Sequence, residues 1–255
     1  MYAVHALSWA TLASFYLGDW DACLHDFGLV VAGLGERGES LTSGFSNPWP
    51  AAAFINEARG DRAASQRLLR EVYEVEERSR KRVSRALSPL ILRTLLLRGE
   101  TQAARARLEV TIEDDATPEN LPLLKLAEAE LLLAEERWDA LDGLAAAMRR
   151  LRQSSGARYL DPAAERVAGR AAAARGEAAE GLRRLQAAAA AYDRVGMAVD
   201  AAVARLDAAE AARAAGRDDD ATRLADAAAG PLRRAGFRRE VERVVLATLT
   251  SRAPA

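Results

Sequence analysis

The sequence predicts an all-α protein, an α-α superhelix (solenoid) of about six helical hairpins followed by a C-terminal capping helix. Two observations support this class. A turn residue recurs at spacings of 42, 39, 37, 40 and 40 residues, and apolar residues on both sides of each turn recur at helical spacing. The turn positions are Gly18, Gly60, Gly99, Glu136, Gly176 and Gly216. We expect each of them to join two antiparallel helices.

Small residues dominate two positions of the repeat, one in each helix of a hairpin. Seven residues before the turns stand Thr11, Ala53, Leu92, Ala129, Gly169 and Ala209, and five after them stand Cys23, Ser65, Ala104, Leu141, Gly181 and Ala221. Two helices pack closely only where their facing side chains are small. At the turns themselves, Gly99 and Gly176 are expected to have positive φ, a conformation that only glycine adopts without strain.

The chain is expected to form one repeat domain over residues 1–255. The approximate repeats are 1–45, 46–80, 81–116, 117–156, 157–196 and 197–237, with a terminal helix over 238–250. Three first helices start where a capping side chain precedes proline, at Ser88-Pro89, Thr117-Pro118 and Asp161-Pro162. The pair Gly230-Pro231 is expected to interrupt the last return helix after Ala229.

Two other segments are described by their composition. Residues 33–50, with four glycines and prolines on both sides of Trp49, are expected to form the longest irregular linker. The basic residues between Arg78 and Arg85 follow several glutamates and are interpreted as a solvated linker; binding of phosphate or of an acidic partner surface is the alternative. In the terminal helix one apolar stripe is expected to lie opposite a charged face. The stripe is Val241, Val244, Val245 and Leu249, and the charged face is Arg239, Glu242 and Arg243.

The repeat resembles the tetratricopeptide repeat, and its best match is the turn Leu17-Gly18-Asp19-Trp20-Asp21. Units of about 40 residues that end in a small-Gly-hydrophobic step resemble the longer tetratricopeptide-like arrays of large bacterial regulators. These are the LuxR-type ATP-dependent transcriptional activators and the ATPase-coupled nucleotide cyclases. The steps are Ser155-Gly156-Ala157, Val195-Gly196-Met197 and Ala235-Gly236-Phe237. The resemblance implies a right-handed superhelix with a concave groove lined by first helices.

Composition excludes several classes of function. The net charge is −1, from 36 basic and 37 acidic residues, so no global field favours direct contact with nucleic acid or an anionic membrane. The single cysteine permits no internal disulfide, which fits a reducing compartment. No apolar run has the length of a membrane span, and the amino terminus has no signal-peptide pattern. We therefore expect a cytoplasmic protein.

No catalytic, cofactor or metal site is predicted. Cys23 and His25 lie about 200° apart around a helix, and His5 lies far from both along the hairpin, so the three residues are poorly placed to bind zinc. Cys23 is interpreted as a buried packing residue. His25 and Asp21 are interpreted as an exposed pair one turn apart, because no nucleophile accompanies them. The acidic run from Asp218 to Asp220 is interpreted as the start of a helix, and Glu113-Asp114-Asp115 lacks a calcium-binding pattern.

The expected groove residues lie six and ten positions before each turn. They are Leu12 and Ser8, Phe54 and Pro50, Arg93 and Pro89, Glu130 and Leu126, Arg170 and Arg166, and Glu210 and Leu206. From these we select Arg93, Glu130, Arg166, Arg170 and Phe54 as candidate ligand-binding residues. Arg166 and Arg170 are like charges one turn apart, an arrangement that favours an anionic neighbour. Two alternatives stay open: an acidic ligand, or internal pairing with Glu130 and Glu210 of adjacent repeats.

The predicted function is a non-catalytic interaction or effector-sensing module of a bacterial transcriptional or signalling regulator. Its partner would be a protein or peptide segment or a small effector, bound in the groove. The alternative is an assembly module that forms homo-oligomers such as a homodimer through aromatic residues of the first repeats. The candidate interface residues are Trp9, Phe15, Trp20 and Trp49.

Overall fold

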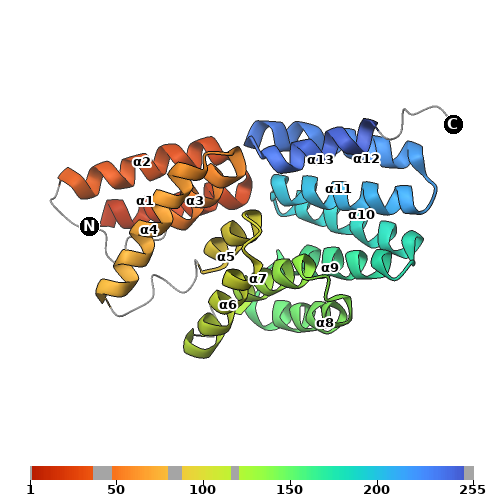
Figure 1. Ribbon diagram of the computed structural model, residues 1–255, viewed down its shortest axis with the longest axis horizontal. Coiled ribbons are helices and arrows are strands. Elements are labelled where there is room, and N and C mark those ends of the chain that lie inside the picture. Colours follow the sequence, from red (N-terminus) through yellow and green to blue (C-terminus); the bar gives the residue numbers. More distant parts are fainter. Residues whose placement is uncertain (1, 37–47, 80–87, 116–120, 250–255) are drawn as a thin grey trace. The chain divides into compact units, whose positions relative to one another are not determined.

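The computed structural model describes residues 2–36, 48–79, 88–115 and 121–249, and in these ranges it contains thirteen α-helices and no strand (Figure 1). The predicted all-α class is therefore confirmed. The first six helices are α1 (Tyr2–Leu17), α2 (Trp20–Glu36), α3 (Pro48–Arg59), α4 (Arg62–Ser79), α5 (Ser88–Leu97) and α6 (Thr101–Asp115). The others are α7 (Leu121–Ala134), α8 (Trp138–Ser155), α9 (Leu160–Ala174), α10 (Ala178–Arg194), α11 (Ala198–Ala214), α12 (Asp218–Ala235) and α13 (Arg238–Leu249).

The helices form two compact units, unit 1 over Met1–Ala127 and unit 2 over Glu128–Ala255. In unit 1, α1 packs on α2, α3 on α4, and α5 on α6, while α3 also contacts α1, α2 and α5. In unit 2, each helix from α8 to α13 packs on the next one along the chain. The first helices α9, α11 and α13 are also neighbours of one another in that order.

The hairpin turns have one shared backbone geometry. The predicted positive φ is confirmed at Gly99, with 76°, and at Gly176, with 86°. In the Gly176 turn, the Glu177 amide donates to the Ala172 carbonyl at 3.0 Å and the Gly176 amide to the Ala173 carbonyl at 3.1 Å. This is a Schellman motif, in which a left-handed residue satisfies the last carbonyls of the helix.

The small positions lie where the helices of a hairpin meet. At Gly169 on α9, an added Cβ would stand 2.8 Å from Leu185 Cγ and 3.1 Å from the Gly181 carbonyl oxygen. At Gly181 on α10, it would stand 2.9 Å from both the Ala173 amide nitrogen and the Gly169 carbonyl oxygen. The two backbones therefore approach so closely that only hydrogen fits at these positions.

The predicted helix boundaries need two corrections. α12 continues through Pro231 to Ala235 and is not interrupted at Gly230, because Leu232 and Ala235 are buried and their packing supports a helix that proline alone would weaken. Asp161 lies inside α9 and makes no capping hydrogen bond. It accepts a hydrogen bond from Arg152 instead, at 3.1 Å.

On α13 the predicted stripe is only partly correct. Val244 is buried, whereas Val245 is 45% exposed. Arg243, which was expected on the charged outer face, contacts three carboxylates of unit 2. The prediction used only the angular position of each residue around the helix. The long side chain of Arg243 reaches across the helix surface to partners that this position does not indicate.

Some predicted features fall partly outside the described residues. The expected linker is shorter than predicted, because α2 continues to Glu36 and α3 starts at Pro48. Residues 37–47, the basic residues 80–87, Thr117-Pro118 and residues 250–255 lie outside the description.

Candidate functional site

The predicted first-helix residues of unit 2 meet in a network of ion pairs. Arg166 on α9 donates from Nε to Asp207 Oδ2 at 2.7 Å and from Nη1 to Glu130 Oε1 at 2.8 Å. Glu130 belongs to α7 and Asp207 to α11. One guanidinium therefore joins three first helices, because its planar fork reaches carboxylates on both sides.

Arg170 and Arg243 extend this network along α11 and α13. Arg170 Nη1 lies 2.6 Å from Glu210 Oε2, and Arg243 Nη2 lies 2.7 Å from Glu210 Oε1. Arg243 also contacts Asp207 Oδ1 at 3.0 Å. The Asp207 network is the set of Glu130, Arg166, Arg170, Asp207, Glu210, Glu240 and Arg243.

Asp207 is the most buried charge of the network, with a side chain that is 2% exposed. Burial alone raises the pKa of its carboxyl, but the three guanidinium groups and a hydrogen bond from Arg166 outweigh burial and hold this pKa well below its usual range. Burial lowers the pKa of Arg166, whereas Asp207 and Glu130 raise it more strongly. For Glu240 burial dominates, so its pKa is raised despite the neighbouring Arg243.

The geometry matches the internal-pairing alternative. Glu130 pairs with Arg166, and Glu210 with Arg170, so both predicted arginines have carboxylate neighbours within the chain. Asp207 and Arg243 were not predicted. A usable signal existed for Asp207, since Arg170 pairs with the residue 40 positions later, which is one repeat length. The residue 40 positions after Arg166 is Leu206, which directly precedes Asp207.

In unit 1 the predicted groove residues Phe54 and Arg93 lie against each other. The Arg93 guanidinium stands 5.0 Å from the centroid of the Phe54 ring, a cation–π arrangement. The Phe54 side chain is buried, and its ring packs edge-on against Phe15 at 5.4 Å and Trp20 at 5.8 Å. Phe54 is thus part of the hydrophobic core in this arrangement.

The four candidate interface residues do not form one surface. Trp9 is 50% exposed, whereas Phe15, Trp20 and Trp49 are buried. Trp49 packs edge-on against Phe27 at 4.9 Å, and its Nε1 donates to Glu71 at 2.7 Å. Three of the four therefore stabilise the core of unit 1, because large aromatic rings contribute most when they are buried.

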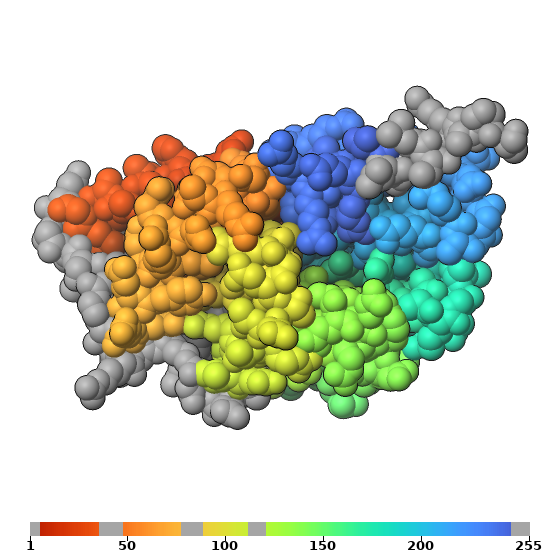
Figure 2. All heavy atoms as spheres, viewed as in Figure 1, coloured from red at the N-terminus to blue at the C-terminus, as the bar shows by residue number. Residues whose placement is uncertain are grey.

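One surface hollow lies in unit 1, between α4, α5 and the turn and helix of α6. Its volume is about 550 Å³. Leu69 and Tyr73 of α4, Leu95 of α5 and Ala103 of α6 supply apolar groups, and Arg70 stands among them. Figure 2 shows the part of the surface where α4, in orange, adjoins α5 and α6, in yellow. We call this cavity the unit 1 hollow.

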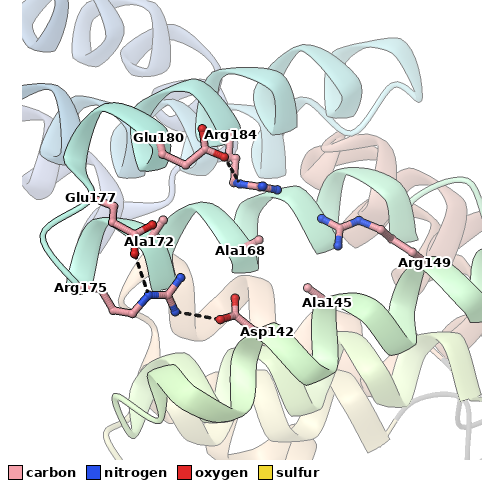
Figure 3. A pocket seen from close by; sticks show the side chains of 9 residues that line it. All are labelled: Asp142, Ala145, Arg149, Ala168, Ala172, Arg175, Glu177, Glu180 and Arg184. Carbon is pink, nitrogen blue, oxygen red and sulfur yellow. Dashed lines mark hydrogen bonds and ion pairs between the residues drawn. The ribbon is translucent and has the colours of Figure 1, made fainter.

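The second hollow lies in unit 2 and has a volume of about 280 Å³. Ala145, Ala168 and Ala172 contribute small apolar groups (Figure 3). Arg175 reaches Asp142 at 2.9 Å and Glu177 at 3.3 Å. We call this cavity the unit 2 hollow.

The other two arginines of the unit 2 hollow are also paired. Arg184 contacts Glu180 at 2.6 Å, and both Arg184 and Arg149 contact Glu165, at 3.3 and 2.7 Å. Every arginine that lines this hollow therefore has a carboxylate partner within unit 2, and the hollow presents a neutral, internally satisfied surface.

The two hollows occupy the same place in the repeat, between the return helix of one hairpin and both helices of the next. Counted from the turns, the equivalent residues are Leu69 and Ala145, Tyr73 and Arg149, Leu95 and Ala172, Arg98 and Arg175, Ala103 and Glu180, and Arg107 and Arg184. This equivalence was not predicted. To predict it, one would have to know where each side chain lies relative to the next hairpin.

The other residues that were considered as catalytic or metal-binding candidates have structural roles. Cys23 is buried, as predicted, and burial raises the pKa of its thiol to about 12, so the thiol is a poor nucleophile. Asp21 accepts a hydrogen bond from Arg59 at 2.8 Å rather than forming the expected pair with His25. Within the described ranges, no group of three or more His, Cys, Asp or Glu residues is arranged to hold a metal ion.

None of the described helices combines the length and the apolar character that crossing a membrane requires. Comparison of the chain with protein-family models and with curated proteins finds no match.

Proposed function

We propose that this chain is a non-catalytic interaction module, built from stacked helical hairpins, that binds a protein segment or a small effector. The observation that carries the proposal is the recurrence of one surface hollow at the same repeat position in both units. Repeat arrays bind partners because stacked units form extended surfaces whose side chains vary while the backbone stays constant. The replacement of Leu69 and Tyr73 by Ala145 and Arg149 is a variation of this kind.

The resemblance to tetratricopeptide-like arrays supports two finer parts of the proposal. The hairpins are proposed to stack as a right-handed superhelix, and the module is proposed to belong to a cytoplasmic bacterial transcriptional or signalling regulator. The internal pairing of Arg166 and Arg170 makes the first-helix face less suited to an acidic ligand, because binding there would have to replace existing ion pairs. The unit 1 hollow is a better candidate, because Arg70 in its lining forms no ion pair with the described residues.

The proposal is tested by screening the full chain against a random peptide library displayed on phage and a panel of small organic acids. We expect resynthesised peptides or individual effectors to bind with micromolar affinity in fluorescence anisotropy or calorimetry. Hydrogen exchange of each complex would then show which helices are protected. A screen in which the folded protein binds nothing specifically would contradict the proposal.

Homo-oligomerisation stays as an alternative because the first hairpin has exposed apolar side chains. Trp9 and Leu17 on α1 and Leu29 on α2 are 50%, 55% and 48% exposed. Exposed apolar patches mark contact surfaces in many proteins. Light scattering over a concentration series distinguishes the two functions: if the protein is an assembly module, its mass rises with concentration and the increase is lost in Trp9→Lys/Leu29→Lys.

A further inference from the structure

A stripe of exposed apolar side chains runs along α1. It consists of Ala6, Trp9, Ala10, Ala13 and Leu17, all of them exposed. Their spacing places them on one face of the helix over about 16 Å. The helix contains no Asp, Glu, Lys or Arg, whereas a helix usually turns charged or polar residues to solvent. We call this face the α1 stripe, and its composition is that of a buried surface.

The same positions are buried in other first helices. Trp9, Ala10 and Ala13 stand nine, eight and five residues before the turn at Gly18. Their equivalents are Ala51, Ala52 and Ile55 on α3, Leu90, Ile91 and Thr94 on α5, Val167, Ala168 and Ala171 on α9, and Asp207, Ala208 and Ala211 on α11, and all of these are buried. The α1 stripe is therefore the counterpart of a packing surface of the repeat.

The packing of α9 shows which element covers this surface. Within unit 2, α9 packs on α10 and α11, just as α1 packs on α2 and α3 within unit 1. In addition, α9 packs on α8, the return helix of the preceding hairpin. Likewise, α3 packs on the return helix α2, and α11 on the return helix α10. The residues that are buried on α9 and exposed on α1 are thus those that a further helix covers.

The charges beside this surface on α9 have no counterpart on α1. Arg149 and Arg152 of α8 pair with Glu165 and Asp161 of α9, at 2.7 and 3.1 Å. At the positions equivalent to these two carboxylates, α1 has Leu7 and Ala3. A helix that covers the α1 stripe would therefore be held by apolar contacts, with no ion pair at these two positions.

Trp9 restricts the shape of the occupant. The equivalents of Trp9 are Ala51, Leu90, Val167 and Asp207, so Trp9 is the only aromatic residue among them. A helix can approach an indole ring closely only where its own facing side chain is small. Large aromatic side chains at the centre of an interface also tend to contribute most of the binding free energy.

We propose that the α1 stripe is a docking site for an amphipathic α-helix of a partner protein, which takes the place that α8 has on α9. The docking helix presents an uncharged apolar face to α1, with a small residue opposite Trp9, and turns its charged residues to solvent. This inference rests on the proposed interaction function and specifies a surface and the chemistry of its partner. It involves neither of the two hollows.

The test uses a phage-displayed library of amphipathic helices of the length of α8, 18 residues, with Ala, Leu, Met and Val varied on the apolar face. The strongest binder to the full chain is resynthesised without tryptophan and labelled with fluorescein. The protein variants are Ala13→Arg and Trp9→Ala, with Ala63→Arg as the matched control. Ala63 is exposed on α4, which packs on α3. Circular dichroism first confirms native helix content in every variant.

We expect Ala13→Arg and Trp9→Ala each to weaken binding at least about tenfold, because the first places an unpaired charge in an apolar interface and the second removes its central ring. The control Ala63→Arg should bind like the wild type. Affinity should change less than about twofold between low and high salt, since screening acts only on charges. Tryptophan emission should shift to the blue on binding, except in Trp9→Ala.

Three results would overturn the docking site while the interaction function stands. The first is a selected helix that binds Ala13→Arg and Trp9→Ala as tightly as the wild type. The second is a failure of all library helices where peptides from the random library bind. The third is self-association of the chain, or binding to phosphatidylcholine vesicles, that Ala13→Arg abolishes while no helix binds, because the occupant is then a second copy or a lipid surface. If no peptide of either library binds, both proposals fail.

Discussion

Glu136 stands where the five other hairpin turns have glycine. Its φ of 55° is the only positive φ of a non-glycine residue in the described part of the chain. The turn still forms the same hydrogen bonds, with the Arg137 amide donating to the Leu132 carbonyl at 2.9 Å. A side chain in the left-handed region costs free energy that glycine does not. The fourth hairpin therefore closes with the same turn in spite of local strain.

We expect Glu136→Gly to raise the free energy of unfolding by about 1 kcal/mol, since it relieves this strain. The reverse change, Gly176→Val, should lower it by about 1 kcal/mol or more, as should Gly99→Val. No atom lies within 4 Å of an added Cβ at Gly176 or Gly99, so the cost there comes from the backbone alone. Urea unfolding followed by circular dichroism measures both directions. Unchanged midpoints in all three variants would contradict the shared turn geometry.

Asp207 shows how a buried charge is tolerated in unit 2. Its carboxylate accepts hydrogen bonds from Arg166 and Arg243, and Arg170 lies 3.5 Å away. Replacement of a buried partner leaves the opposite charges uncompensated, which typically costs about 3–5 kcal/mol. The network is thus a condition for packing α9, α11 and α13 together rather than a net source of stability.

Asp207→Asn should destabilise unit 2 at neutral pH and reduce its acid sensitivity. Because the pKa of Asp207 is depressed in the folded state, its stabilising contribution is present above the unfolded-state pKa of about 3.9 and is lost as the pH falls below it. Stability measured from pH 6 to pH 2 should therefore fall less steeply in the variant. Asp226→Asn, at an exposed position of α12, is the control. A variant with the wild-type slope would contradict this role.

At the scale of elements, α9 and α10 approach closely where Gly169 faces Gly181. Ten of the twelve small-position residues are larger than glycine, and the two glycines face each other in this hairpin. Glycine inside a helix usually costs about 1 kcal/mol relative to alanine. Here the close approach of the two helices offsets that cost, and at Gly181 two of the three nearest atoms belong to the backbone.

Gly181→Ala should lower the free energy of unfolding by about 1–2 kcal/mol, because overpacking outweighs the gain in helix propensity. Gly169→Ala should cost less, since its nearest contact is the Leu185 side chain, which can shift. Gly143 on α8 is the matched control. It has no atom within 4 Å of an added Cβ, so Gly143→Ala should stabilise the protein by about 0.5–1 kcal/mol. The midpoints of thermal unfolding of the three variants, compared with the wild type, measure these effects. Stabilisation by Gly181→Ala would contradict the close approach of the two helices.

At the scale of the whole molecule, the two units have cores of different composition. The core of unit 1 contains Phe15, Trp20, Trp49 and Phe54, whereas α9 to α12 of unit 2 bury mainly alanine. Burial stabilises by about 25 cal/mol per Å² of apolar surface. An alanine repeat therefore gains less free energy per hairpin than an aromatic one.

We expect the amides of α10 to α12 to exchange with solvent faster than those of α3, as measured by hydrogen exchange on the full chain at neutral pH. Exchange reports local opening, whose free energy falls with the apolar area that a segment buries. In Asp207→Asn the exchange of α11 should rise further while α3 stays unchanged. Equal protection of both regions would contradict the assignment of lower stability to the alanine repeats.

The hairpins were predictable because their signals are local. A glycine at a left-handed turn and small residues at fixed distances from it are properties of one hairpin, and the sequence repeats this pattern six times, five of them with glycine at the turn. Cys23 could be assigned to the core for the same reason. The fate of Pro231 was not predictable, since a helix that continues through proline depends on the packing of Leu232 and Ala235.

The sequence alone therefore determined the all-α class, the positions of the turns and the small residues that allow the helices of a hairpin to pack closely. Only the tertiary structure decided which charges are paired, that Trp20 and Phe54 are buried together, and where the hollows lie. The physical reason is distance along the chain: Arg166 and Asp207 are 41 residues apart. Their contact depends on how one hairpin stacks on the next and on the reach of a flexible side chain, neither of which a periodic pattern specifies.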